Sequence, residues 1–403
     1  MRLRTTTAAA IALASATATG CGPSTNAVTD PAPSTSASNS TTATPIPGST
    51  AAPTPTVSAR TATPRPTSCA LPVSRWSARQ LAGAVLMAPA RLDNLAAAAP
   101  MIASGVGGVV LFGSPVGDIR AQLRQLHAAA GAWPLLVASD EEGGGIQRLA
   151  ALTGALPWPR DLATLAPATI RAMARRMAVA LRALTVRIDL APVADLDAGP
   201  GPDDTHPDGK RSFSADPATA TADVLAFARG LIDAGIVPVV KHYPGLGTAT
   251  ANTDAGAGVT SPLSTLRTRD LLPFAAAVRA GLPAIMTSNA IVPGLSPLPV
   301  SLSAAATRLL RHDLGFRGAI ITDSLSAASI TAAGFTLNAA AVRALAAGAD
   351  AVILGGGDTK DPGALAASVR ASIVAAVASG QLSIARLREA AQRLARLMGA
   401  VTC

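Results

Sequence analysis

Aromatic residues make up only 2% of this 403-residue chain, which has six Phe, three Trp and one Tyr. Proteins that bind single-stranded nucleic acid need aromatic rings on which bases stack, so this scarcity argues against that class. It also predicts a core of Ala, Leu, Val and Ile. The hydrophobic fraction of 49% and the charged fraction of 14% exclude a wholly disordered chain. They provide enough apolar surface for one large domain or two small ones.

Long hydrophobic runs and lysines are also scarce. No apolar run after the first twenty residues approaches 18 residues, which excludes a polytopic membrane protein. The only lysines are Lys210, Lys241 and Lys360, so arginine carries nearly all of the net charge of +9. This composition is typical of GC-rich coding bias, although a basic surface would also favour anionic wall polymers or lipid head groups. The arginines are spread over many expected helices, so we expect no nucleic-acid partner.

The N-terminus has the features of a bacterial export signal. Arg2 and Arg4 precede a mildly apolar segment, and Thr19-Gly20-Cys21 follows. Small residues before a cysteine resemble the lipobox of bacterial lipoproteins, although Ala18 stands where Leu is more usual. We therefore expect residues 1–20 to be a signal peptide, Cys21 to be lipidated, and the protein to be anchored on the outer side of the cell membrane. The alternative is ordinary secretion with a free Cys21.

Residues 21–68 form a Ser/Thr/Pro/Ala-rich segment without Leu or aromatic residues. Such a segment cannot bury enough apolar surface to offset its ordering entropy, so it predicts a disordered tether that spans about 40 Å. Cys69 and Cys403 flank the remaining chain, residues 69–403. In an exported protein they are expected to form a disulfide that joins the ends of one domain, the alternative being two free thiols.

Short apolar segments alternate with helical patterns through residues 69–403. A capping box at Ser77 and Gln80 predicts a helix that continues into the apolar run 81–87. Further helices are expected at 118–130, 167–184, 217–234 and 263–281, and strands at 106–112, 135–139, 187–193, 236–240, 284–287, 319–322 and 350–354. Continuous apolar strands that alternate with helices indicate a parallel sheet covered by helices. The expected fold is a single-domain (β/α)8 barrel of the TIM type.

Polar clusters follow five of the expected strands, where barrels of this type place their chemistry. Each has a structural explanation: Asp323 could cap a helix, Lys241 could pair with a carboxylate, and Asp140 could bind backbone amides in a turn. Their convergence on one rim of the barrel favours sugar recognition, because charged side chains form hydrogen bonds with hydroxyl groups. A carboxylate facing the anomeric carbon can act as the nucleophile of a retaining hydrolysis, which also needs a proton donor.

Four segments resemble motifs of family 3 glycoside hydrolases, in the single-domain β-N-acetylglucosaminidase branch. They are DEEGGGIQRL at 140–149, RSFSADP at 211–217, KHYPGLG at 241–247 and LRHDLGFRGAIITDSLSAASI at 310–330. The resemblance implies that Asp323 is the nucleophile. It implies that an N-acetylglucosamine ring is held by Asp140, Arg148, Arg211, Lys241 and His242. The neighbouring cations are expected to keep Asp323 ionised.

The chain departs from the family in the acid/base loop, where the family pattern has an Asp and, two residues later, a His. Asn252 and Asp254 occupy these positions here. Asp254 would serve as the acid only if burial near Asp323 raised its pKa. The three hypotheses are an active enzyme on terminal β-linked N-acetylglucosamine of peptidoglycan fragments, a catalytically impaired sugar-binding lipoprotein, and a glycosidase or transferase with another substrate. We expect a monomer that needs no metal or cofactor, since the four His show no ligand spacing.

Overall fold

The computed structural model describes residues 73–131, 133–203 and 206–399. The predicted signal peptide, Cys21, the tether and the predicted Cys69–Cys403 disulfide lie outside these residues and stay predictions. Within the described part, no helix combines the length and the apolar character needed to cross a membrane.

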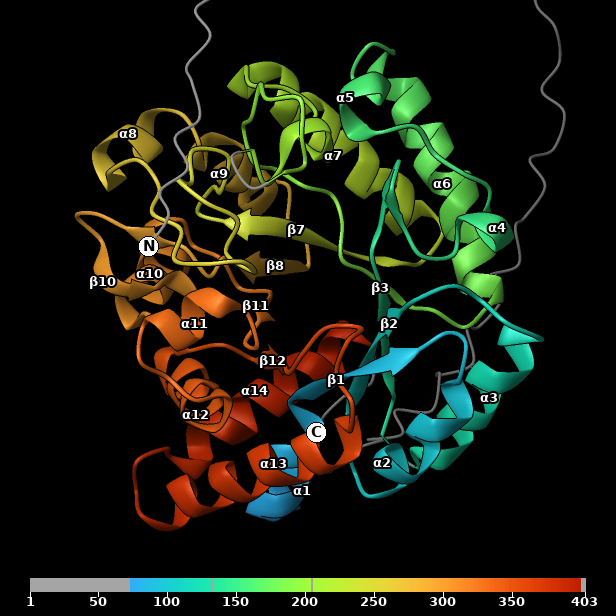
Figure 1. The fold of residues 1–403 in the computed structure, drawn as a ribbon, viewed down its shortest axis with the longest axis vertical. Helices are drawn as coiled ribbons and strands as arrows, with labels where there is room; N and C mark the ends of the chain where they lie inside the picture. Colours follow the sequence, from blue (N-terminus) through green and yellow to red (C-terminus); the bar gives the residue numbers. More distant parts are fainter. Residues whose placement is uncertain (1–72, 132, 204–205, 400–403) are drawn as a thin grey trace, which may run out of the picture. The chain divides into compact units, whose positions relative to one another are not determined.

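Eight parallel strands close into a barrel, which confirms the expected fold (Figure 1). Around the barrel the order is β1-β12-β11-β8-β7-β6-β3-β2. The strands are β1 (Leu86–Arg91), β2 (Gly108–Phe112), β3 (Leu136–Ser139), β6 (Ile188–Asp189), β7 (Val237–Tyr243), β8 (Ala284–Thr287), β11 (Ala319–Ser324) and β12 (Ala351–Ile353). Two antiparallel hairpins stand apart from the barrel: β4 (Glu141–Gly143) with β5 (Ile146–Gln147), and β9 (Ile291–Val292) with β10 (Ser296–Pro299). Closure leaves the barrel without an open sheet edge.

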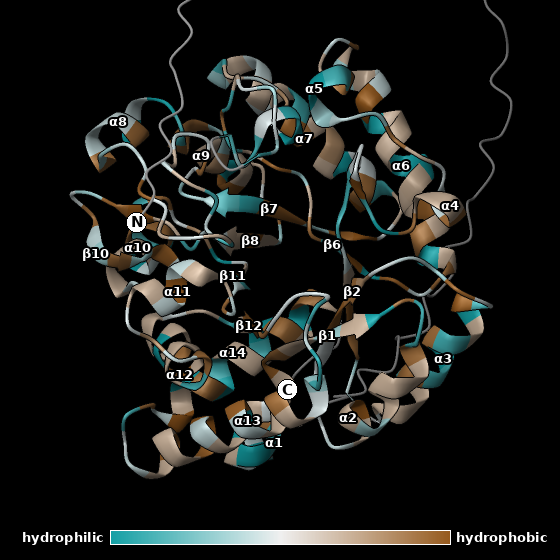
Figure 2. Cartoon of the chain, in the orientation of Figure 1, coloured by the Kyte–Doolittle hydropathy of each residue, from teal (hydrophilic) through white to brown (hydrophobic). Residues whose placement is uncertain are grey.

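Helices surround the barrel. They are α1 (Ala78–Ala84), α2 (Ala99–Ala103), α3 (Ile119–Ala129), α4 (Ala150–Thr153), α5 (Pro159–Leu162), α6 (Pro167–Ala183), α7 (Pro217–Asp233), α8 (Leu263–Thr268), α9 (Leu271–Arg279), α10 (Ala304–Arg308), α11 (Ala328–Ala332), α12 (Leu337–Ala347), α13 (Pro362–Ala378) and α14 (Ile384–Leu397). Short helical turns are η1 (Val73–Arg75), η2 (Leu95–Ala98), η3 (Gly209–Arg211), η4 (Val300–Leu302) and η5 (Leu309–Asp313). The strand interiors are apolar, and β7 becomes hydrophilic toward its carboxyl end (Figure 2).

Polar side chains cap the N-termini of several helices. The predicted capping box of Ser77 and Gln80 is present at α1. Asp118, Asp216 and Asp361 accept hydrogen bonds from first-turn backbone N–H groups of α3, α7 and α13. Such caps satisfy backbone donors that a helix leaves unpaired at its start, so they fix where each strand-to-helix connection ends.

Two expectations about the elements were wrong. The apolar run 81–87 is not one continuous helix. Helix α1 ends at Ala84, and β1, the one barrel strand that the sequence did not predict, starts at Leu86. The expected helix 263–281 is divided into α8 and α9 at Arg269 and Asp270. Pro273 explains this break, because its ring conflicts with a helical carbonyl four residues earlier, at Arg269.

Candidate active site

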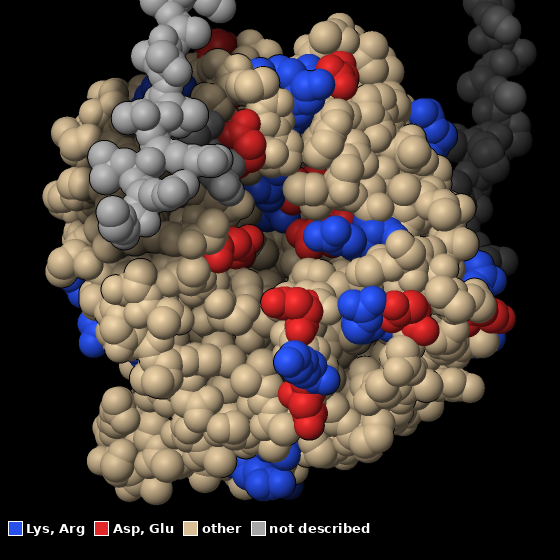
Figure 3. Space-filling model, viewed as in Figure 1, with Lys and Arg blue, Asp and Glu red and all other residues tan. Residues whose placement is uncertain are grey.

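A cavity of about 480 Å³ opens at the carboxyl ends of the barrel strands. This volume is typical of small-molecule sites. Both Lys/Arg and Asp/Glu side chains gather around the central hollow on this face (Figure 3). All seven predicted site residues line the cavity: Asp140, Arg148, Arg211, Lys241, His242, Asp254 and Asp323. The structure therefore brings together residues that lie as many as 183 positions apart in the sequence.

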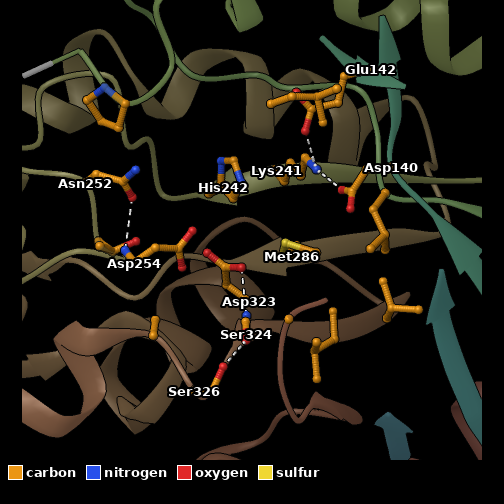
Figure 4. Close-up of a pocket in the computed structure, with 18 of the residues that line it drawn as sticks. Asp140, Glu142, Lys241, His242, Asn252, Asp254, Met286, Asp323, Ser324 and Ser326 are labelled. Atoms are coloured by element: carbon orange, nitrogen blue, oxygen red, sulfur yellow. Dashed lines mark hydrogen bonds and ion pairs between the residues drawn. The ribbon is translucent and has the colours of Figure 1, made fainter. Parts of the chain in front are cut away.

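Lys241 is held between two carboxylates on one side of the cavity (Figure 4). It lies near the end of β7, and its Nζ is 2.6 Å from Asp140 Oδ1 and 2.6 Å from Glu142 Oε1. Asp140 directly follows β3 and Glu142 lies in β4, so alternate residues face the same side. The expectation that Lys241 could pair with a carboxylate is thus confirmed, and its ammonium group is fixed at the cavity wall.

Arg211 forms a bidentate ion pair with Glu142. Its Nε and Nη2 donate to Glu142 Oε2 and Oε1 at 2.8 and 2.9 Å, and its Nη1 donates to the Pro207 carbonyl at 3.2 Å. Burial opposes ionisation of Glu142, but the charges of Arg211 and Lys241 outweigh it and hold the pKa of this carboxyl well below its usual range. Glu142 therefore stays charged and fixes two cations at once.

The loop that carries Arg211 is itself held by a buried carboxylate. Asp197 Oδ1 and Oδ2 accept hydrogen bonds from the backbone N–H groups of Gly199 and Gly209 at 2.6 and 2.8 Å. Gly209 has a φ of +48°, in the left-handed region that glycine favours. This turn precedes Arg211 directly and sets the direction in which its side chain enters the cavity.

His242 is oriented by Asp195. Asp195 Oδ2 accepts from the His242 backbone N–H at 3.0 Å and lies 2.6 Å from His242 Nδ1, while its Oδ1 accepts from the Leu246 N–H at 2.6 Å. Burial, assisted by the charge of Arg211, lowers the pKa of His242 to about 4, so the ring is neutral at neutral pH. Burial raises the pKa of Asp195 to about 7, while the Leu246 and His242 N–H groups favour its ionised form. In the tautomer whose Nδ1 donates to ionised Asp195, Nε2 is the acceptor for a ligand hydroxyl.

A three-residue group beneath the cavity has the composition of a metal site. Asp195, Asp208 and His242 place one ligand atom each within 4.8 Å of one another. The hydrogen bonds of the preceding paragraph already engage Asp195 and His242 Nδ1. Burial and the charge of Asp195 raise the pKa of Asp208 to about 8, so without a cation this carboxyl is mainly protonated at neutral pH. The group is best explained as the support of the His242 ring.

Asp323 lies near the end of β11 with its carboxylate in the cavity. Its Oδ1 accepts from the Ser324 N–H at 2.7 Å, which leaves Oδ2 without that restraint. The alternative that Asp323 caps a helix is wrong, because α11 starts at Ala328 and has no side-chain cap. Asn289 supports the turn after Asp323: it donates to the Ser324 carbonyl at 2.7 Å and accepts from Ser301 Oγ at 2.6 Å.

Asp254 and Asp323 both line the cavity, and their carboxyl groups point toward each other (Figure 4). Asn252 Oδ1 accepts from the Asp254 N–H at 3.0 Å and thereby forms a tight turn. The carbonyls of Thr253 and Asp254 accept from the N–H groups of Ser329 and Ala328, at 3.1 and 3.3 Å. Because α11 follows Asp323 closely in the chain, these bonds fix the Asp254 loop relative to Asp323.

The two facing carboxyls are both shifted toward protonation. Burial raises the pKa of Asp323, and the charge of Asp254 raises it further, while His242 opposes the shift. Asp254 is exposed as a residue, but its carboxyl is enclosed by the cavity, and this enclosure raises its pKa. The charge of Arg211 opposes this shift, whereas the charges of Asp140 and Asp358 add to it. The expectation that the neighbouring cations keep Asp323 ionised stays a prediction, because a raised pKa gives the direction of the shift and not the charge state at neutral pH. Lys241 and Arg211 are already paired with Asp140 and Glu142.

Arg148 completes the predicted set from the other side of the hairpin β4–β5. Its guanidinium carbon lies 5.8 Å from the centre of the Phe112 ring, a cation–π geometry. Its Nε is buried without a hydrogen-bond partner among the described residues. The contact with Phe112 orients the Arg148 guanidinium group, and its Nε remains available to donate to a ligand.

Sequence reasoning missed several residues that hold this site, above all Glu142, Asp195, Asp197 and Asn289. Glu142 stands two positions after Asp140 in a segment expected to be extended, so period-2 alternation was a usable signal. Asp195, Asp197 and Asn289 all stand in the polar clusters that follow the expected strands, and this position was the available signal. Their partners depend on loop conformation and do not follow from that signal.

Comparison with known proteins agrees with this geometry. The model of the glycosyl hydrolase family 3 N-terminal domain matches residues 83–397. The chain belongs to glycosyl hydrolase family 3. It is 40% identical over 256 residues to beta-hexosaminidase LpqI of Mycobacterium tuberculosis, an alignment that covers 61% of this chain and 65% of that protein, just under two thirds. A beta-hexosaminidase of Xylella fastidiosa is 36% identical over 262 residues, covering 62% of this chain and 76% of that protein.

Solved structures of family 3 proteins share the whole fold. The structure of M. tuberculosis LpqI has a TM-score of 0.75 and 33% identity, covering 82% of this chain and 97% of that one. A β-N-acetylhexosaminidase from Beutenbergia cavernae has a TM-score of 0.73 and 32% identity, covering 80% of this chain and 99% of that one. The family resemblance that the four motifs indicated is therefore confirmed.

Proposed function

We propose that this protein is a retaining β-N-acetylglucosaminidase that removes terminal β-linked N-acetylglucosamine from peptidoglycan fragments. The observation that carries the proposal is the pair of carboxyls, Asp323 and Asp254, that point toward each other in a cavity of about 480 Å³. Membership of family 3 and the names of the relatives, beta-hexosaminidase and β-N-acetylhexosaminidase, support the substrate class. The lipobox-like Thr19-Gly20-Cys21 supports a lipid-anchored protein outside the cell membrane.

In the first step, Asp323 is the nucleophile. Because the Ser324 N–H holds Oδ1, Oδ2 is the oxygen that forms the bond to C1 of the sugar. The bond from C1 to the glycosidic oxygen breaks, and protonated Asp254 gives its proton to that oxygen. In the second step, ionised Asp254 takes a proton from water, which attacks C1 and releases Asp323. One shared proton suffices for the pair, and the raised pKa of both groups favours a form with one proton.

The remaining polar groups are placed to hold the sugar ring. Lys241, Arg211 and Arg148 offer donors to sugar hydroxyls, whereas Asp140 and neutral His242 Nε2 offer acceptors. Rigid support from Glu142 and Asp195 places these groups before the substrate arrives, which lowers the entropic cost of orienting it.

The leaving group of the substrate separates the roles of the two carboxyls. A dinitrophenyl β-N-acetylglucosaminide needs little protonation of its leaving group, whereas an N-acetylglucosamine disaccharide needs it fully. Asp323→Asn should abolish cleavage of both, because the covalent step is lost. Asp254→Asn should slow the disaccharide by about 10²–10⁴-fold and affect the formation of the glycosyl-enzyme from the activated substrate little.

Two outcomes would decide against parts of the proposal. If the wild type cleaves neither substrate but binds N-acetylglucosamine, and Arg211→Ala loses that binding, the protein is a sugar-binding lipoprotein. If the first sugar product is the α-anomer by NMR, the mechanism is not retaining. The variant Asp233→Asn, on the exposed end of α7, is the control and should keep full activity.

A further inference from the structure

The end of the barrel opposite the sugar cavity has a hollow of its own. It has a volume of about 400 Å³ and lies between the segments that lead into β8 and β11, at Pro283 and Gly318, and the end of α14. Met286 and Asp323, which line the sugar cavity, lie farther along the same two strands. The hollow and the cavity are therefore at opposite ends of the barrel.

Three arginines border this hollow: Arg317, Arg393 and Arg396. Arg317 and Arg396 are exposed, and their guanidinium groups have no hydrogen-bond or ion-pair partner within the described ranges. Arg317 precedes β11, whereas Arg393 and Arg396 lie in α14, so the three arginines come together through the fold and not through the sequence. Two unpaired guanidinium groups beside one hollow are a site for an anion with several oxygen acceptors, such as a phosphate group.

The charges behind the hollow do not neutralise it. Buried Asp350 pairs with Arg311, Arg386 and Arg393 at 2.7, 2.5 and 3.2 Å. Glu389 pairs with Arg386 and Arg393 at 2.6 and 2.5 Å. Three arginines against two carboxylates leave one positive charge in excess, to which Arg317 and Arg396 add two. The nearby Asp313 is exposed and lies 3.5 Å from Arg267, so its charge is matched elsewhere.

The rest of the hollow is apolar. Leu282 and Phe316 are buried in its wall, and Val278 and Leu397 are partly buried. A free phosphate would make no use of this surface, whereas a phosphate attached to glycerol and hydrocarbon would cover it. We propose that this hollow binds the phosphate of an anionic phospholipid and that this end of the barrel docks on an anionic membrane surface. Docking in this way turns the sugar cavity away from the membrane.

Vesicle binding tests the proposal without the lipid anchor. The full chain with Cys21→Ala is mixed with vesicles of phosphatidylglycerol and phosphatidylcholine, or of phosphatidylcholine alone, and binding is measured by flotation. We expect binding to the anionic vesicles, weakened by added salt. Arg317→Glu with Arg396→Glu should weaken it by at least about 25-fold, since each basic residue near the surface contributes about fivefold.

The control is Arg120→Glu with Arg124→Glu, which makes the same change in net charge on the exposed side of α3. Equal loss in both double variants would show that only net charge matters and would overturn the site, as would absence of binding to anionic vesicles. Binding to soluble poly(glycerol phosphate) that depends on Arg317 and Arg396, without binding to vesicles, would assign the hollow to a wall polymer instead. Circular dichroism and thermal unfolding identify any variant that fails to fold, and Arg317→Gln with Arg396→Gln then replaces it.

Discussion

Replacing Glu142 by glutamine tests the electrostatic support of the sugar cavity. Glu142 accepts two hydrogen bonds from Arg211, at 2.8 and 2.9 Å, and pairs with Lys241 at 2.6 Å, while its side chain is only 1% exposed. Glutamine keeps one acceptor, but its NH₂ group must face a cation. Breaking a buried ion pair by removing one partner costs about 3–5 kcal/mol, because it leaves an uncompensated charge.

Against a total stability of about 5–15 kcal/mol, this loss is easily measured by urea unfolding. The matched control is Asp233→Asn, which breaks the exposed pair with Arg171 and should cost at most about 1 kcal/mol. In the folded wild type the pKa of Glu142 is lowered, so its contribution is full above the unfolded-state pKa of about 4.3 and falls as the pH drops below it.

The difference in free energy of unfolding between wild type and Glu142→Gln should thus be full at pH 7 and shrink by pH 3. A difference below about 1 kcal/mol at pH 7, or one that does not change between pH 7 and pH 3, would refute the assignment of Glu142 as a charged anchor. The same variant should also lose activity, because Arg211 and Lys241 lose their common partner.

Three further predictions concern other parts of the molecule. The kcat/KM for an N-acetylglucosamine disaccharide should fall as the pH rises through the raised pKa of Asp254, and Asp254→Asn should remove this limb of the pH profile. Gly144→Ala should lower the free energy of unfolding by well over 1 kcal/mol in urea, since its Cβ would lie 2.0 Å from a Trp158 ring atom. The control is Gly131→Ala, which is also at positive φ but has open space around it, and it should lower that free energy by only about 1 kcal/mol. Asp350→Asn should cost about 3–5 kcal/mol while kcat is retained, because Asp350 lies at the other end of the barrel.

The sequence predicted the fold well because parallel strands buried on both faces are continuous apolar runs, and seven such runs overlap seven of the eight barrel strands. It failed at β1, where the apolar run 81–87 fits the interior of a helix as well as that of a strand. What decides there is a long-range contact: a Cβ on Gly83 would lie 2.0 Å from the Gly105 carbonyl oxygen, and the Gly107 N–H donates to the Gly83 carbonyl. Such contacts between segments cannot be read from local periodicity.

The site divides in a similar way. The seven predicted site residues came from the four motifs and the acid/base loop, and all of them line the cavity. The motifs did not predict the charge states of these residues. A motif shows which cations lie near Asp323, but not which carboxylates form ion pairs with those cations. Only the coordinates show that Lys241 and Arg211 are paired with Asp140 and Glu142.

This pairing bears on the substitution of the family His by Asp254. A carboxyl is a useful acid near neutral pH only if its surroundings disfavour its ionised form. Had Lys241 and Arg211 been free, their charges would have held both Asp323 and Asp254 ionised. Because Asp140 and Glu142 are paired with them, burial and the mutual repulsion of the two carboxyls prevail and raise the pKa of both above its ordinary value. Asp140→Asn should therefore lower the pH at which disaccharide cleavage declines, whereas an unchanged pH profile would show that another group supplies the proton.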